Sequence, residues 1–109
     1  MEYKSYVHML TPTDRKRYQH LREGKKISGF VVQYETKIGD KWYPVVRYDT
    51  AHGVAHKDVL NHRGLREKVM LGEMDYKEAL NLADVDIREN WTSYRAQFLR
   101  RMGKSTTPP

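Results

Sequence analysis

The segment from Arg47 to His62 carries the side chains of this sequence that could do chemistry. Three of the five histidines lie in it, next to an arginine, a tyrosine and two aspartates. Histidine changes its charge near neutral pH, so it can give or take a proton under cellular conditions. Gly53 lets the backbone turn sharply, which could aim a histidine into a pocket. The candidate site residues are Arg47, Tyr48, Asp49, His52 and His56.

These residue types suit a phosphoester reaction, such as RNA cleavage, that needs no metal ion. One histidine would act as general base, a second histidine or Tyr48 as general acid, and Arg47 would stabilise the charge of the phosphate. The alternative is a structural role for the same residues. In that case Asp49 caps a turn, Arg47 pairs with a neighbouring carboxylate and the histidines are solvated strand residues. The sequence leaves both interpretations open.

A metal site is another interpretation of the same segment. Its ligands would come from His52, His56 and His62 with Asp49 or Asp58. Histidines four residues apart share a face on a helix, but on a strand they are about 13 Å apart. We therefore expect no metal site and no cofactor. Nothing in the sequence resembles a Walker loop, a dinucleotide fingerprint or a catalytic serine elbow.

Positive charge gathers in the N-terminal part of the chain. Lys and Arg number 20 against 14 Asp and Glu, and the formal net charge of +6 favours a polyanionic or acidic partner. Tyr18 and His20 lie among the basic residues and could stack on bases or contact sugar and phosphate. RNA or DNA is the predicted partner, and the alternative is a solvated helix face. The candidate nucleic-acid contacts are Arg15, Lys16, Arg17, Arg22, Lys25 and Lys26.

Turn signals and side-chain periodicity predict the elements that would position these residues. Thr11 followed by Pro12 is typical of a helix start, and we expect a short helix that ends at about Glu23. Glycine-containing turns then separate four runs in which apolar side chains alternate with polar ones. These runs predict an antiparallel four-stranded meander over residues 27–38, 41–49, 54–60 and 65–71.

The C-terminal helix is the clearest element in the sequence. Asp75 and Glu78 form a capping box at its start. Apolar side chains then recur every three or four residues and form one stripe. The stripe consists of Leu80, Ala83, Ile87, Trp91, Tyr94, Phe98 and Met102. The predicted fold is therefore α+β: a four-stranded antiparallel meander with a short N-terminal helix and a long C-terminal helix packed on one face.

Length and composition set the broader expectations. We expect residues 1–103 to form a single α+β domain and residues 104–109 to be a disordered tail. The chain has no cysteine, which suits a reducing compartment, and we predict a cytoplasmic protein. No stretch approaches the roughly 20 apolar residues of a membrane span. We therefore expect no membrane partner.

Two stretches of the sequence resemble a known family. They are Arg47-Tyr48-Asp49-x-Ala51-His52-Gly53-x-x-His56 and Leu80-x-x-Ala83-x-x-Asp86-Ile87-x-x-Asn90-Trp91-x-x-Tyr94. Over residues 30–98 the chain is similar to the TumE-like toxins of prokaryotic toxin–antitoxin pairs. That family carries an Arg-Tyr-Asp-Asn segment followed by clustered histidines, whereas this chain has Thr50 in place of the asparagine. The resemblance implies an antitoxin as protein partner, and RNA or the translation machinery as target.

We therefore expect an RNA-directed protein of the toxin–antitoxin type, whose site contains Arg47, Asp49, His52 and His56. The alternative is a non-catalytic basic module that binds nucleic acid or a protein. A third interpretation is an oligomeric scaffold. A homodimer would be compatible with each of the three.

Overall fold

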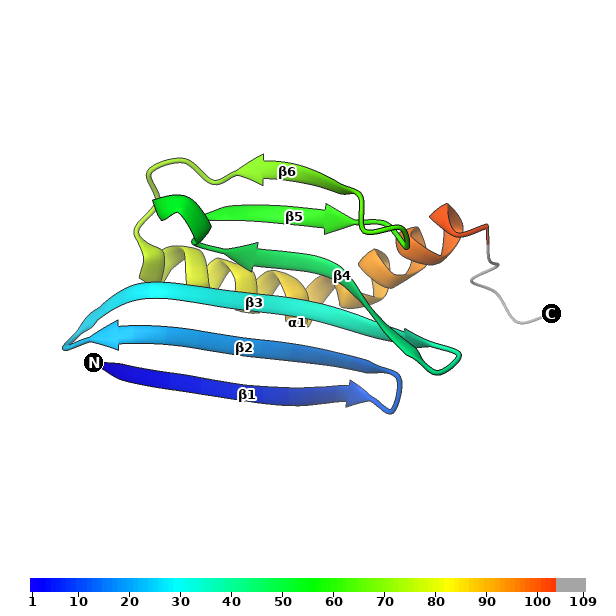
Figure 1. Cartoon of the computed structure of the whole chain (residues 1–109), viewed down its shortest axis with the longest axis horizontal. Coiled ribbons are helices and arrows are strands. Elements are labelled where there is room, and N and C mark those ends of the chain that lie inside the picture. Colours follow the sequence, from blue (N-terminus) through cyan, green and yellow to red (C-terminus); the bar gives the residue numbers. More distant parts are fainter. Residues whose placement is uncertain (104–109) are drawn as a thin grey trace.

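The computed structural model describes residues 1–103, which form a six-stranded antiparallel sheet and one long helix (Figure 1). The strands are β1 (Glu2–Thr11), β2 (Asp14–Glu23), β3 (Lys26–Ile38), β4 (Lys41–Asp49), β5 (His56–Leu60) and β6 (Arg66–Met70). They lie in the sheet in chain order, each beside the strands before and after it. A short 3-10 helix, Ala51–Gly53, connects β4 to β5. Helix α1 spans Tyr76–Arg101.

The prediction of a four-stranded meander with a short N-terminal helix is wrong. Strand β2 occupies the segment expected to be helical and forms a hairpin with β1, so the sheet has six strands. Thr11, which the sequence suggested as a helix cap, closes the turn of this hairpin. Its hydroxyl accepts a hydrogen bond from the Thr13 amide over 3.1 Å and donates one to the Asp14 carboxylate over 2.6 Å. The same turn residues thus serve a hairpin instead of a helix start.

Strand β2 is polar on both faces, which hides its two-residue period in the sequence. Arg15 and Arg17 point away from α1, and each has its Nε near Glu35 Oε1, at 2.5 Å and 3.2 Å. Lys16 points to the opposite face and contacts Asp84 of α1 at 2.5 Å. Each of these three cations thus pairs with a carboxylate on another element of the fold. These tertiary contacts and the pairing with β1 and β3 override the helix propensity of arginine and lysine.

The core lies between one face of the sheet and α1. Its buried apolar members on the central strands and the helix are Phe30, Val32, Tyr34, Val45, Val46, Tyr48, Ala79, Leu80, Ala83, Ile87 and Phe98. The ring of Tyr34 packs against Trp91 with 5.9 Å between centroids. The predicted C-terminal helix is present, and Asp75 accepts a hydrogen bond from the Lys77 amide at its start. The α+β class is confirmed.

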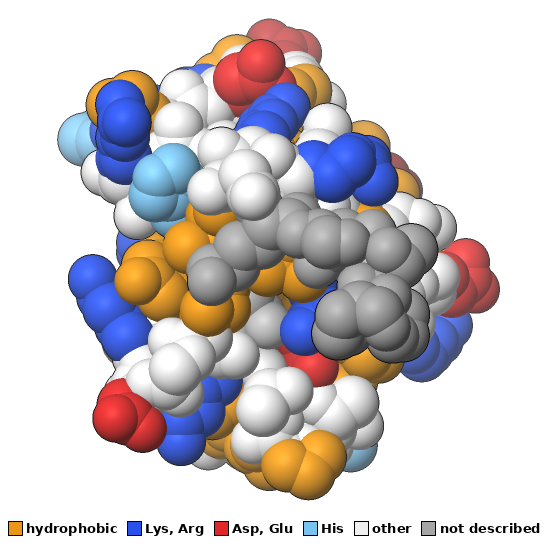
Figure 2. Space-filling view, turned by 90° about the vertical axis from the view of Figure 1, so that its right-hand side faces the viewer, with side chains coloured by type: hydrophobic (Ala, Val, Ile, Leu, Met, Phe, Trp, Pro, Cys, Tyr) orange, Lys and Arg blue, Asp and Glu red, His pale blue; other side chains and the backbone are white. Residues whose placement is uncertain are grey.

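Helix α1 lies behind the sheet in Figure 1 and packs mainly on β3 and β4. Within residues 1–103 no helix covers the other face of the sheet, which we call the uncovered face. Figure 2 views the end of the molecule that carries the β1–β2 and β3–β4 turns. On the part of this end that the figure leaves visible, Lys and Arg side chains are scattered among hydrophobic and uncharged ones and form no single patch.

Two further expectations concern the C-terminal residues and membrane-spanning helices. Residues 104–109, predicted to be a disordered tail, lie outside the described residues. Among residues 1–103, no helix combines the length and the apolar character needed to cross a membrane.

Candidate functional site

The predicted site residues are divided between the two faces of the sheet and a turn. Arg47 and Asp49 lie on the uncovered face, and Tyr48 between them points toward α1, because side chains alternate along a strand. His56 of β5 is paired with Asp49 in the β4–β5 register and shares its face. His52 is exposed on the 3-10 turn, with a left-handed φ of 65°. The structure thus brings together Arg47, Asp49 and His56, but not Tyr48 or His52.

Asp49, His56 and Asp58 form a compact group that we call the Asp-His-Asp cluster. The residues are 5%, 4% and 1% exposed. His56 Nε2 lies 3.0 Å from Asp49 Oδ1 and 3.7 Å from Asp58 Oδ2. The other ring nitrogen, Nδ1, is 3.1 Å from the Val54 carbonyl oxygen. A carbonyl oxygen can only accept, so Nδ1 carries a hydrogen and Nε2 is left facing the two carboxylates. His62, another metal ligand considered from the sequence, lies outside this group of three.

Two arginines flank the Asp-His-Asp cluster. Arg47 Nε lies 3.0 Å from Asp49 Oδ2, and Arg66 Nη1 lies 3.7 Å from Asp58 Oδ2. Both arginine side chains are partly exposed, at 44% and 58%. Asp49 Oδ1 also accepts a hydrogen bond from the Ala51 amide over 2.9 Å. Because both oxygens of Asp49 have partners, this carboxylate holds the Arg47 guanidinium in place.

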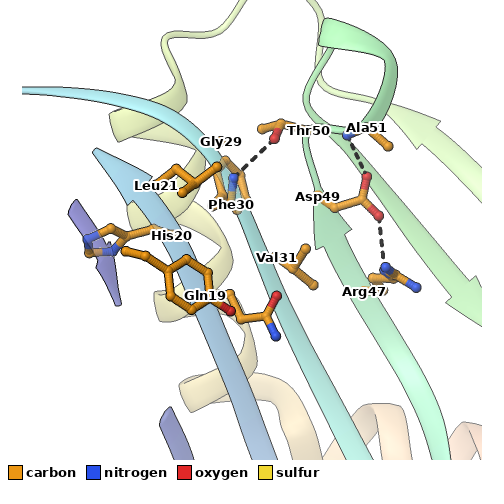
Figure 3. A pocket seen from close by; sticks show the side chains of 11 residues that line it. Gln19, His20, Leu21, Gly29, Phe30, Val31, Arg47, Asp49, Thr50 and Ala51 are labelled. Atoms are coloured by element: carbon orange, nitrogen blue, oxygen red, sulfur yellow. Dashed lines mark hydrogen bonds and ion pairs between the residues drawn. The ribbon is translucent and has the colours of Figure 1, made fainter. Parts of the chain in front are cut away.

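Arg47 also borders a hollow on the uncovered face. Figure 3 shows Arg47 and Asp49 of β4 across from Gln19 of β2, with Val31 of β3 between them. This cavity has a volume of about 270 Å³. A neighbouring cavity of about 170 Å³ is lined by Arg17, Gln19, Val31, Gln33 and Arg47. The two cavities share Gln19, Val31 and Arg47, so we treat them as one depression and call it the Arg17–Arg47 groove.

The six basic residues predicted to contact nucleic acid do not share one face. Lys16 points toward α1, and Arg22 pairs with Glu2 at 2.6 Å. Lys25 and Lys26 are exposed at the β2–β3 turn. The remaining two, Arg15 and Arg17, lie on the uncovered face, where the Arg15 guanidinium stacks 3.9 Å from the ring centroid of Trp42. Only Arg17 of the six lines the groove with Arg47.

A second polar group lies between the sheet and the helix, around Asp86. Its Oδ2 accepts hydrogen bonds from the hydroxyls of Tyr48 over 2.5 Å and Tyr94 over 2.6 Å, and Asn90 donates to Oδ1 over 2.8 Å. Burial opposes ionisation, but these hydrogen bonds and the nearby Lys57 outweigh it and hold the pKa of Asp86 below its ordinary value. Burial and the bond to Asp86 raise the pKa of Tyr48. Tyr48 is thus held as a donor to the helix.

From the sequence, Asp86 is named only in the stretch that resembles the TumE-like family, and Asp58 only as an alternative metal ligand. A signal for Asp86 was present, because it follows Ala83 by three residues and precedes Asn90 by four, which places a charge in register with the apolar stripe of α1. Asp58 follows His56 by two residues, so on a strand the two share a face. The signal for Asp86 is therefore a charge in register with a buried apolar stripe, and the signal for Asp58 is its two-residue spacing from His56.

Fold and site together define a small α+β protein with an arginine-lined groove beside a buried Asp-His-Asp cluster, on the sheet face opposite its single long helix. Residues 1–104 match the family model described as Domain of unknown function (DUF7718), and the chain belongs to this family. No curated protein and no solved structure matches the chain. The family description names no activity, so the resemblance to TumE-like toxins stays a prediction.

Proposed function

We propose that this protein is an RNA-directed protein of the prokaryotic toxin–antitoxin type and that it binds RNA in the Arg17–Arg47 groove. The observation that carries the proposal is the pair of arginines that line one groove on the uncovered face. Their side chains are 45% and 44% exposed, so both guanidinium groups are accessible to a phosphate. Arginine binds phosphate through paired, charge-assisted hydrogen bonds.

The groove keeps a positive balance although its arginines have acidic neighbours. Glu35 Oε1 is shared by Arg15 and Arg17, so one negative charge faces two guanidinium groups. Arg47 has the second acidic neighbour, Asp49. The carboxylates of Glu35 and Asp49 are only 9% and 7% exposed, so both keep their contacts with the arginines. An RNA phosphate can bind the exposed side of each guanidinium without displacing these carboxylates, and the release of counterions favours binding.

Other side chains on this face suit single-stranded RNA. Gln19 lies beside the arginines and offers its amide donor and acceptor to base edges. Gln33 lies there too, but its Nε2 donates to Glu35 Oε2 over 2.5 Å, so it offers mainly its amide oxygen. The ring of Tyr3, which is 62% exposed, borders the same groove. Proteins that recognise single-stranded RNA stack its bases on aromatic side chains and hydrogen-bond to the base edges. These features favour single-stranded RNA over a duplex.

The geometry supports RNA binding more directly than RNA cleavage. Phosphoester chemistry at the groove would depend on Asp49 and His56, because Tyr48 points toward α1. The His56 side chain is 5% exposed and faces two carboxylates, and Asp49 is engaged by Arg47. Both groups would have to leave these contacts to reach a ribose hydroxyl. RNA cleavage is therefore not part of the proposal, and the analysis of cellular RNA described below tests it separately.

The proposal includes action in the cytoplasm and a protein antitoxin as partner. Strand β1 supports a protein partner, because it is a ten-residue strand at the edge of the sheet. Tyr3, Val7 and Met9 on it are 62%, 47% and 49% exposed. An exposed edge strand can pair with a strand of another chain. A homodimer would use the same edge, and light scattering of the purified protein distinguishes a monomer that awaits an antitoxin from a dimer.

Growth arrest in a bacterial host tests the proposal. Induced wild-type protein is expected to arrest growth, and the Arg17→Gln/Arg47→Gln variant is expected to lose this effect at equal protein level. Lys77→Gln/Arg88→Gln removes two exposed charges from α1 and serves as the matched control. Arrest that is unaffected by the groove variant would contradict the proposal, as would a harmless wild-type protein.

The same cultures separate binding from cleavage. Total RNA that stays intact while it co-purifies with the wild-type protein indicates binding alone. RNA that is shortened by the wild type but not by His56→Gln would add phosphoester chemistry at the Asp-His-Asp cluster. Shortening by both forms would remove His56 from the reaction.

A further inference from the structure

We propose that the Asp-His-Asp cluster binds a divalent transition-metal ion, Zn²⁺ or Mn²⁺, through His56 Nε2 and carboxylate oxygens of Asp49 and Asp58. The inference goes beyond RNA binding and does not depend on it. It rests on the positions of three potential ligand atoms, on the orientation of the imidazole ring and on a buried oxygen that has no hydrogen-bond partner.

The three side chains already approach the spacing of a metal site. One ligand atom from each lies within 4.8 Å of the other two. His56 Nε2 is 3.0 Å from Asp49 Oδ1 and 3.7 Å from Asp58 Oδ2. Nitrogen and oxygen ligands bound about 2.1 Å from one ion lie roughly 3 to 3.5 Å apart in tetrahedral or octahedral geometry. Small side-chain rotations would therefore complete the site, and the backbone register already supplies the arrangement.

The orientation of the His56 ring leaves Nε2 facing two carboxylates, a position that suits a proton or a metal ion. Because Nδ1 donates its hydrogen to the Val54 carbonyl, a neutral ring would direct the Nε2 lone pair toward two carboxylates. That contact is repulsive unless a proton or a metal ion lies between the groups. A histidine that binds a metal typically donates its other ring hydrogen to a backbone carbonyl or a carboxylate, as His56 does.

A buried oxygen without a partner provides independent support. Asp58 is 1% exposed, and among residues 1–103 its Oδ1 has no hydrogen-bond partner. An unsatisfied buried carboxylate oxygen is costly, because it has lost water without gaining another donor. A metal ion at the cluster would supply the missing partner, since Asp58 can turn or use both oxygens.

The flanking arginines leave room for this ion. Arg47 contacts Asp49 Oδ2, and the oxygen nearer to His56 is Oδ1. Arg66 is 58% exposed and lies 3.7 Å from Asp58, so it can swing into solvent. An imidazole nitrogen combined with carboxylate oxygens suits Zn²⁺ or Mn²⁺ better than Ca²⁺ or Mg²⁺, which prefer oxygen ligands alone.

Calorimetric titration of the full-length protein, stripped of metal with a chelator, tests the proposal. Zn²⁺ or Mn²⁺ is expected to bind at one ion per chain, whereas Mg²⁺ at the same concentration is expected to give no measurable heat. Either bound ion should raise the melting temperature by about 10 °C at a hundredfold excess over its dissociation constant. His56→Gln and Asp58→Asn should abolish the binding. Asp14→Asn, which alters a carboxylate that is also buried (3% exposed), should retain it.

Nitrogen NMR of the His56 ring gives a second measurement that a purely structural ion pair would not reproduce. On addition of Zn²⁺, the Nε2 resonance should shift and lose its proton, and the Nδ1 proton should remain. Absence of saturable Zn²⁺ and Mn²⁺ binding would overturn the proposal. So would binding that survives both cluster variants, or an Nε2 proton that persists in the presence of excess metal, because His56 would then be the cation that joins the two aspartates.

Discussion

Tyr48 of β4 donates a hydrogen bond to Asp86 of α1 over 2.5 Å, directly behind the strand that carries Arg47 and Asp49 on its other face. Since successive side chains of a strand point in opposite directions, a tyrosine held against the helix fixes the direction of both neighbours. The contact between sheet and helix thus determines which residues reach the uncovered face. The position of Arg47 in the Arg17–Arg47 groove therefore depends on the packing of Tyr48 against α1.

This relationship makes Tyr48→Phe a specific test of the packing. Loss of the hydroxyl removes a charge-assisted hydrogen bond to Asp86 and should lower the free energy of unfolding by about 2 kcal/mol. Urea unfolding at neutral pH measures the change. Tyr43→Phe is the matched control, since its partly buried ring packs on Phe98 and its hydroxyl makes no hydrogen bond within residues 1–103. Equal losses in the two variants would show that the Tyr48 hydroxyl contributes nothing.

Acid should destabilise the protein through Asp14 and Asp86. For both, burial opposes ionisation but is outweighed by hydrogen bonds to the carboxylate, so the folded pKa lies below the ordinary value of 3.8. The folded state therefore binds fewer protons than the unfolded state, and the stabilisation is complete above the unfolded pKa. It is lost as the pH falls through the folded pKa.

Melting curves recorded at falling pH check this expectation. The wild type should lose stability steeply below about pH 4. The Asp14→Asn and Asp86→Asn variants should start from a lower stability at neutral pH and show a shallower fall. A fall in either variant as steep as that of the wild type would assign the acid sensitivity to other carboxylates.

The sequence predicts the fold correctly where a strong pattern is compatible with only one secondary structure. The capping-box pattern of Asp75 and Glu78 and an apolar stripe repeated over many turns predict α1 whatever it packs against. The β1–β2 hairpin was missed because β2 buries little apolar surface and its alternation runs through charged side chains. Lys16 and Arg17 take opposite faces, and only the positions of Asp84 and Glu35 in the fold distinguish them.

The sequence points to Arg47, Asp49 and His56 as candidate residues, but it does not assign them to a face of the sheet. The site predicted from the sequence contains both His52 and His56, whereas the structure has His52 exposed on the 3-10 turn and His56 buried on β5. The actual cluster combines alternation along β5, which places His56 beside Asp58, with the cross-strand pairing of Asp49 and His56. Cross-strand register follows from turn geometry and packing, which a single sequence encodes only indirectly.

His52 offers a test of its own role. Its φ of 65° lies in the left-handed region, which costs a histidine about 1 kcal/mol and a glycine almost nothing. His52→Gly should therefore raise the free energy of unfolding or leave it unchanged, whereas His52→Ala should not raise it. Urea unfolding of the two variants measures this. The growth assay tests whether His52 has a function. Because His52 lies outside the groove, both variants should still arrest growth.

The salt dependence of RNA affinity tests the central claim most directly, with a labelled single-stranded oligonucleotide followed by fluorescence anisotropy. If Arg17 and Arg47 each bind one phosphate, the Arg17→Gln/Arg47→Gln variant should bind at least tenfold more weakly, and its slope of log affinity against log salt should be shallower by about 1.4. The Lys77→Gln/Arg88→Gln control should match the wild type. Equal affinity and slope in all three proteins, or the absence of salt-dependent binding by the wild type, would contradict RNA binding in the Arg17–Arg47 groove.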